Sequence, residues 1–243
     1  MLIIGHRGAA GLAPENTLAG FARAVELGVD GVELDVHLAE SEVVVIHDER
    51  VDRTTNGVGL VRELTFAELR RLDAGDGQRV PTLNEVLDLV PEHMLVNIEL
   101  KGVGTAEPVA AIVGDLASGA QRGGLPALLV SSFDHRELRR FHEIQPSVPC
   151  APLADRWCPC LESTARALDA WSVNLSRRVT TKAHVDAVRS WGRRCLVFTV
   201  NDPVKARALR GLGVTGVFTD YPDRLVDEPA SRFSSSASSR CSS

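Results

Sequence analysis

The chain has 243 residues, of which 24% are charged and 44% hydrophobic, with a formal net charge of -5 at pH 7. Single α/β barrels commonly have about 250 residues, so this length can bury a complete core in one domain. The charge balance argues against a broad nucleic-acid surface, and the apolar runs are far shorter than the roughly 20 residues that cross a bilayer. We therefore expect neither a nucleic-acid partner nor a membrane span.

The first predicted strand begins at residue 2, with no basic leader and no apolar stretch of about 7 to 15 residues ahead of it, so we expect a cytoplasmic protein. The five cysteines, an odd number without paired CxxC spacing, are typical of a reducing compartment: Cys150, Cys158, Cys160, Cys195 and Cys241. Cys158 and Cys160 could form a metal or redox pair. Two ligands without a matching second pair make a poor zinc site, however.

The chain opens with a strand, a helix and a second strand. The apolar run Leu2 to Gly5 is the first strand, and a loop of small residues follows it. Asn16 or Thr17 can cap a helix whose apolar positions recur every three to four residues and which ends at Gly28. The second strand, Asp30 to Val36, comes next, so the pattern predicts a β-α-β unit with parallel strands.

The third predicted strand, Val43 to Ile46, lies very close to the second one in the sequence. Only residues 37–42 separate them, whereas a parallel crossover normally needs about a dozen residues or more. Either an extended link returns the chain, or this strand pairs antiparallel. The local sequence leaves both arrangements open.

Residues 49–80 are predicted to form an excursion beside the strand ends. They contain Asn-Gly and Asp-Gly turn signals around a short helix, Phe66 to Leu72, and could form one wall of a pocket. Thr82 then caps a helix that continues to Val90. The remaining predicted strands alternate with helices and are Leu95 to Leu100, Ala127 to Ser131, Val148 to Pro152, Ser172 to Leu175, Cys195 to Val200 and Gly216 to Thr219.

This alternation predicts an α/β fold with a parallel sheet, and an eight-stranded barrel fits it best. Nine strands are predicted for eight places, so one lies outside the barrel or is not a strand. A doubly wound open sheet is the alternative, although no GxGxxG follows the first strand. The Ser-rich composition of residues 229–243 predicts a disordered tail.

Two carboxylates on the second strand point to a functional site. Glu33 and Asp35 are two residues apart, so their side chains share one face. Acidic residues are costly to bury unpaired, and Mg²⁺ or Ca²⁺ is the simplest partner for such a pair. An edge strand with one solvated face is the alternative. The carboxyl ends of parallel strands gather on one face, which would bring together His6, Arg7, Glu33, Asp35, His47, Glu99 and Lys101.

Several short segments, taken in order, resemble the glycerophosphodiester phosphodiesterase family. They are His6-Arg7-Gly8, Pro14-Glu15-Asn16-Thr17, Glu33-Leu34-Asp35, His47-Asp48, Glu99-Leu100-Lys101, Ser132-Phe133, Thr199-Val200-Asn201 and Thr219-Asp220-Tyr221-Pro222. The similarity spans about residues 3 to 226 and is closest to the short cytosolic bacterial members. It implies a distorted TIM-type (β/α)8 barrel with a small inserted segment, about residues 49–80, after the third strand. We expect a single catalytic domain over residues 1–228.

The resemblance also implies a reaction of glycerol and lipid metabolism. Members of the family hydrolyse glycerophosphodiesters such as glycerophosphocholine or glycerophosphoethanolamine to glycerol 3-phosphate and an alcohol, and they require one divalent cation, here Mg²⁺ or Ca²⁺. By motif match Glu33, Asp35 and Glu99 would be the metal ligands, and His6 and His47 the acid-base pair. The substrate contacts would be Arg7, Lys101 and Phe133, with Glu15 in a supporting role. No role is assigned to His37, His93, His135, His142 or His184.

The chemistry of a phosphodiester requires these residue types. A metal ion and cationic side chains neutralise the charge that builds on the phosphate oxygens, and histidines exchange protons near neutral pH. The nucleophile is either water or the 2-hydroxyl of the substrate's glycerol.

Two alternative functions stay open. One is a diesterase for lysophospholipids or another diester, and the other is a non-catalytic binding relative, which would normally lack an acid or His6. The family often has Trp where Phe198 stands, so the preferred head group of the substrate stays open. The oligomeric state is also open.

Overall fold

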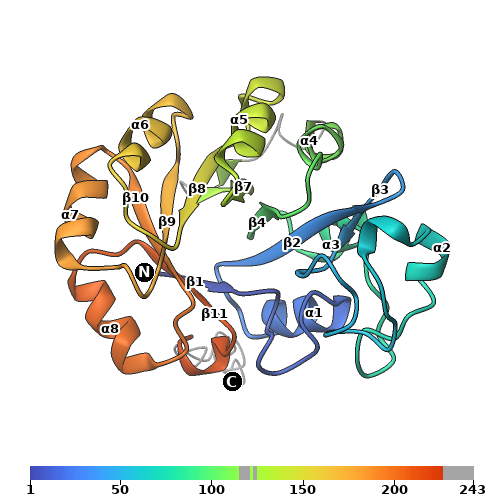
Figure 1. The fold of residues 1–243 in the computed structure, drawn as a ribbon. Coiled ribbons are helices and arrows are strands. Elements are labelled where there is room, and N and C mark those ends of the chain that lie inside the picture. Colours follow the sequence, from blue (N-terminus) through green and yellow to red (C-terminus); the bar gives the residue numbers. More distant parts are fainter. Residues whose placement is uncertain (115–120, 123–124, 227–243) are drawn as a thin grey trace, which may run out of the picture.

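The computed structural model describes residues 1–114, 121–122 and 125–226. Within them, eight parallel strands form a closed barrel with helices around its outside (Figure 1). In their order around the barrel these strands are β1 (Leu2–Gly5), β2 (Gly31–Ala39), β4 (Leu95–Leu100), β7 (Leu128–Ser132), β8 (Cys150–Ala154), β9 (Ser172–Ser176), β10 (Arg194–Phe198) and β11 (Gly216–Thr219). β1 pairs with both β2 and β11, which closes the barrel. The predicted TIM-type fold is confirmed, and the open sheet is excluded.

The ninth predicted strand lies outside the barrel. β3 (Glu42–Val45) pairs antiparallel with the last part of β2, where Ala39 lies opposite Glu42. The two residues between them form a tight turn, and Glu40 adopts the positive φ of 56° that such hairpin turns require. The short connection is therefore a hairpin, which answers the question that the sequence left open.

The helices that cover the barrel begin at side-chain caps in several places. Thr17 caps α1, where its hydroxyl accepts from the backbone N–H of Gly20, and Thr82 forms a capping box with Glu85 at the start of α3. Such caps are each worth about 1 kcal/mol. The covering helices are α1 (Leu18–Glu26), α3 (Leu83–Leu89), α4 (Ala106–Gly114), α5 (His135–Ile144), α6 (Cys160–Ala167), α7 (Lys182–Ser190) and α8 (Pro203–Gly211). Their apolar faces bury Phe21, Leu83, Leu138 and Phe141 against the strands.

The barrel interior has its own apolar layer. Ile4, Leu95, Leu129, Leu196 and Phe218 form one buried cluster there. They lie nearer the amino-terminal ends of most strands than the polar residues do, so the carboxyl ends remain available for chemistry. No helix in the described part of the chain is long and apolar enough to cross a membrane.

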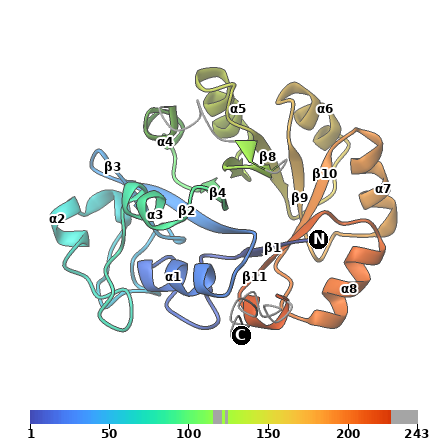
Figure 2. The same cartoon turned by 180° about the vertical axis from the view of Figure 1, so that it is seen from behind.

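The segment between β3 and α3 lies to one side of the barrel (Figures 1 and 2). It carries η1 (Val61–Glu63) and α2 (Phe66–Leu69), which is shorter than the predicted helix to Leu72. A separate apolar cluster that includes Val51, Val61, Leu69 and Val80 holds this segment together. Two short strands, β5 (Gln121–Arg122) and β6 (Leu125–Pro126), pair with each other and were not predicted. The predicted disordered tail lies outside the described residues.

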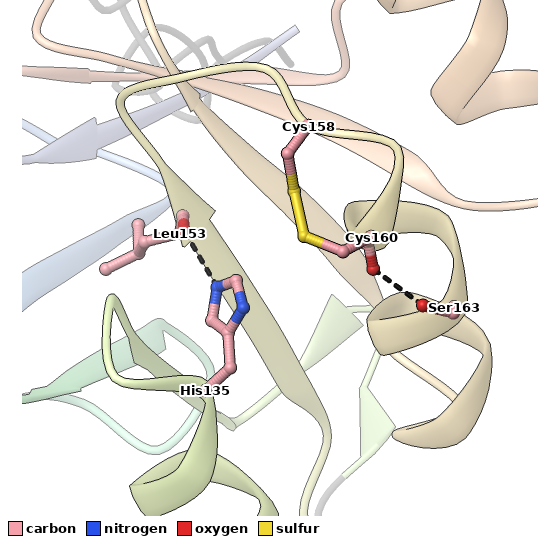
Figure 3. Close-up of a disulfide and its surroundings, with 5 residues drawn as sticks. All are labelled: His135, Leu153, Cys158, Cys160 and Ser163. Atoms are coloured by element: carbon pink, nitrogen blue, oxygen red, sulfur yellow. Dashed lines mark hydrogen bonds between the residues drawn. A yellow bond between two sulfur atoms is a disulfide. The ribbon is translucent and has the colours of Figure 1, made fainter.

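Cys158 and Cys160 form a disulfide beside β8 (Figure 3). Their Cα atoms are 5.3 Å apart, which is within the range that a disulfide spans. The cysteine count indicated reduced thiols, and at this pair that indication is wrong because the loop before α6 brings the two side chains together. Cys150 and Cys195 are free and buried, and burial raises the pKa of both thiols to about 12. Cys241 lies outside the described residues.

Candidate active site

Three buried carboxylates from two adjacent strands of the barrel meet in one place. Glu33 and Asp35 extend from β2 and Glu99 from β4, and the strand register places Asp35 directly opposite Glu99. Their exposed fractions are 3%, 1% and 8%, respectively. One oxygen from each carboxylate lies within 4.8 Å of the others. The three predicted metal ligands therefore form one group.

The electrostatics of this group fit a hard divalent cation. Burial and the charge of Asp35 raise the pKa values of Glu33 and Glu99 well above the ordinary range of a glutamate. One oxygen of Glu99 is buried and accepts no hydrogen bond, although the Lys101 ammonium lies 3.1 Å from it. Carboxylate oxygens with spare lone pairs are what Mg²⁺ and Ca²⁺ bind.

These pKa shifts predict how metal binding depends on pH. A raised pKa means that the folded, metal-free protein holds protons that the unfolded chain releases, so its stability falls as pH rises above the usual glutamate value of 4.5. A bound cation removes this penalty. We expect saturating Mg²⁺ or Ca²⁺ to raise Tm by about 5 to 10 °C at about pH 8 and by clearly less at about pH 6. Thermal unfolding with each metal or with EDTA measures this, and equal shifts at both pH values would contradict it.

His6 follows β1 directly and lies beside the carboxylates. Its Nδ1 is 2.6 Å from Asp220 Oδ1, and Asn201 donates to the other oxygen of Asp220 at 2.7 Å. The opposite nitrogen, Nε2, is 4.0 Å from Glu33. Burial lowers the pKa of His6, but the charge of Glu33 and the hydrogen bond to Asp220 outweigh it and raise the pKa.

His47 follows β3 and has a similar arrangement. Its Nδ1 is 2.5 Å from Asp48 Oδ1. The Nε2 of His37 lies 3.1 Å from the backbone carbonyl oxygen of His47. No role was assigned to His37 from the sequence. Burial lowers the pKa of His47, and the charge of Asp35 and the hydrogen bond to Asp48 only partly oppose this. Both candidate histidines thus have Nδ1 bound to a carboxylate, which leaves Nε2 for chemistry.

The two cationic side chains lie on the carboxylate group. The Arg7 Nε is 3.4 Å from Asp35, and the Arg7 backbone N–H donates to Glu33 at 2.9 Å. A hydrogen bond of 2.9 Å joins Arg7 Nη1 to Glu15, the residue predicted to support the site. The Lys101 ammonium is 3.8 Å from Asp35, in addition to its ion pair with Glu99.

The aromatic residue predicted to contact the substrate stands at the edge of this group. The side chain of Phe133 is 42% exposed, so it is not part of the core. Its ring meets that of Phe198 edge-on, with centroids 5.7 Å apart, and the Lys101 ammonium is 5.7 Å from its centroid. The two rings form an apolar wall beside the cations.

Sequence reasoning missed several residues of this site. Asn16 donates to Asp35 at 2.9 Å, while Asp48, Asp220 and Arg53 take part through hydrogen bonds to other site residues. Asn16, Asp48 and Asp220 lie within the segments that carried the family resemblance, which was a usable signal. Arg53 is one of many surface arginines in the sequence, and only the fold brings it to the site.

The chain matches the model of the glycerophosphoryl diester phosphodiesterase family over residues 6–224. This match covers nearly all of the described barrel, including every candidate site residue. The chain belongs to this family. As a member it is a phosphodiesterase, and the resemblance seen in its sequence motifs is confirmed.

Individual relatives agree with the family match. The chain is 37% identical to YhdW of Bacillus subtilis, over 94% of this chain and 98% of that protein. It is 35% identical to a glycerophosphodiester phosphodiesterase of Caldanaerobacter subterraneus, over 93% and 96% of the two chains. Among solved structures, a phosphodiesterase of Oleispira antarctica in complex with the product sn-glycerol-3-phosphate superposes with a TM-score of 0.84 and 31% identity. That superposition covers 93% of this chain and 95% of the Oleispira protein.

Proposed function

We propose that this phosphodiesterase hydrolyses glycerophosphodiesters to glycerol 3-phosphate and an alcohol with the help of one divalent cation. The observation that carries the proposal is the buried group of Glu33, Asp35 and Glu99 flanked by two carboxylate-bound histidines. The product bound to the Oleispira antarctica relative supports the substrate class. We further propose that residues 1–228 form a single catalytic unit. The cytoplasmic location expected from the sequence stays a prediction.

In the proposed reaction the cationic side chains bind the phosphate. Arg7 and Lys101 lie on the carboxylate group and would contact the non-bridging oxygens, where charge builds in the transition state. Phe133 would line the entrance for the alcohol part of the diester. The cation, held by Glu33, Asp35 and Glu99, would supply Lewis-acid stabilisation of the phosphate oxygens.

The histidines would carry the protons. His47, whose pKa is lowered, would accept the proton of the nucleophile, and His6, whose pKa is raised, would give one to the leaving oxygen. A cyclic glycerophosphate that builds up during a time course would identify the glycerol 2-hydroxyl as the nucleophile.

Release of glycerol 3-phosphate tests the proposed substrate class. We expect glycerophosphocholine and glycerophosphoethanolamine to yield it when Mg²⁺ or Ca²⁺ is added, and EDTA to abolish the release. Lysophospholipids, the second candidate substrates, belong in the same panel, because the apolar wall of Phe133 and Phe198 could also contact an acyl chain. Lysophospholipid cleavage without release from either soluble diester would move the assignment to lipids. No cleavage of any diester in the panel would mean that the enzyme acts on a different phosphodiester.

A further inference from the structure

Arg53 lies in the segment that extends from the barrel, yet its guanidinium contacts two carboxylates at the site. It donates to Asp48 from Nε at 2.6 Å and from Nη2 at 3.1 Å. It donates to Glu15 from Nη1 at 2.9 Å and from Nη2 at 2.7 Å. All three guanidinium nitrogens are therefore used, and each carboxylate receives two hydrogen bonds, which is the strongest geometry for this type of pair.

Each of these carboxylates in turn holds a residue of the proposed machinery. Asp48 binds the Nδ1 of His47, and Glu15 binds the Nη1 of Arg7. A continuous series of contacts therefore runs from His47 through Asp48, Arg53 and Glu15 to Arg7. It joins the candidate general base to a candidate phosphate ligand.

The charges along this series are balanced by Arg53. Its hydrogen bonds are among the causes that hold the pKa values of Asp48 and Glu15 below their ordinary range, and they fix the orientation of both carboxylates. Without Arg53, each carboxylate would lose two of the hydrogen bonds that fix it beside His47 or Arg7, and no side chain would bridge the two. Lysine could restore the charge but not bridge both partners, because only a guanidinium has a planar fork of donors.

We propose that Arg53 is a positioning residue for phosphodiester hydrolysis, which sets the orientation of His47 and Arg7 together through Asp48 and Glu15. This inference rests on the proposed function for its effect on rate. It assigns the segment between β3 and α3 a part in the reaction, because that segment supplies Arg53.

Steady-state kinetics of arginine variants tests this proposal. We expect Arg53→Ala to lower kcat by about 10- to 100-fold and to raise KM, since both His47 and Arg7 lose their support. Arg53→Lys should recover only part of the loss, and added guanidinium ion should partly restore Arg53→Ala. Arg50→Ala is the matched control: Arg50 is exposed in the same segment, binds Asp52 at 2.9 Å and contacts no site residue. Unchanged kinetics of Arg53→Ala beside an active wild type would overturn the proposal.

A double-mutant cycle separates positioning from a general loss of structure. If Arg53 acts partly through Asp48, then Asp48→Asn should lower kcat, and adding Arg53→Ala to it should cost less than Arg53→Ala does alone, with the remaining loss running through Glu15. Additive losses in kcat would contradict a shared path. The midpoint of thermal unfolding, measured for each variant, identifies any variant that fails to fold. If Arg53→Ala does not fold, Arg53→Lys, which keeps the charge, takes its place in the cycle.

A second readout does not need the enzyme's substrate. The ¹⁵N chemical shifts of the His47 ring report which nitrogen carries the proton, and the wild type should hold it on Nδ1, against Asp48. Arg53→Ala should shift this tautomer balance, whereas Arg50→Ala should not. If the wild type cleaves no glycerophosphodiester, the proposed function fails but this measurement still decides the role of Arg53. A His47 ring with unchanged shifts in Arg53→Ala would refute that role.

Discussion

Replacing Asp35 with asparagine should reduce metal-dependent hydrolysis about a thousandfold or more, which corresponds to about 4 kcal/mol of transition-state stabilisation. Asp35 is the most buried carboxylate of the group and lies between the other two proposed ligands. Asparagine keeps its shape and can still pair with Asn16, so the substitution removes charge with little change in packing. Kinetics of glycerol 3-phosphate release across a range of Mg²⁺ and Ca²⁺ concentrations measures the loss.

Metal titration separates this effect from unfolding. The Asp35→Asn variant should bind Mg²⁺ or Ca²⁺ far more weakly in calorimetry. Its thermal stability in EDTA should be equal to or higher than that of the wild type, because the like charge beside Glu33 and Glu99 is gone. Glu162→Gln is a matched control, since Glu162 is exposed on α6 and pairs with Arg166. Wild-type metal affinity and turnover in Asp35→Asn would show that the carboxylate group is not the metal site.

The second large effect concerns the histidines. His6→Ala and His47→Ala should each lower kcat by about 10²- to 10⁴-fold, the usual range for general acid-base catalysis. In the wild type, kcat should follow a bell-shaped pH profile. The acidic limb would report protonation of His47 and the basic limb deprotonation of His6, because the pKa of His47 is lowered and that of His6 is raised. Full activity in either variant would refute its assignment.

A change of leaving group distinguishes the two histidines. A p-nitrophenyl diester needs no proton on its leaving oxygen, so it should restore much of the activity of His6→Ala and little of that of His47→Ala. The opposite pattern would exchange the two roles. Equal recovery in both variants would mean that neither histidine is the dedicated acid. His184→Ala serves as a control, because His184 stacks on Trp157 on the outside of the barrel and contacts no residue of the site.

Much of the fold could be predicted because it depends on local periodicity. Apolar runs of four to six residues between helical segments identify the strands of a parallel barrel. Thr82 was predicted correctly as a helix cap, and of the two candidates Asn16 and Thr17 the structure has Thr17. The pairing of β3 could not be decided locally, since its partner depends on which neighbour has free backbone groups. The short pair β5 and β6 escaped because two-residue strands carry no periodic signal.

The candidate site could likewise be predicted only in part. The amino-acid sequence by itself determined that Glu33 and Asp35 share one face of their strand, since side chains alternate with period two whatever the rest of the chain does. Only the tertiary structure decided which side chains hold them in place. Asp220 reaches His6 across 214 positions of sequence, and Arg53 reaches Glu15 across 38. Such contacts arise when the barrel closes and a segment lies against it, and no local pattern encodes that closure.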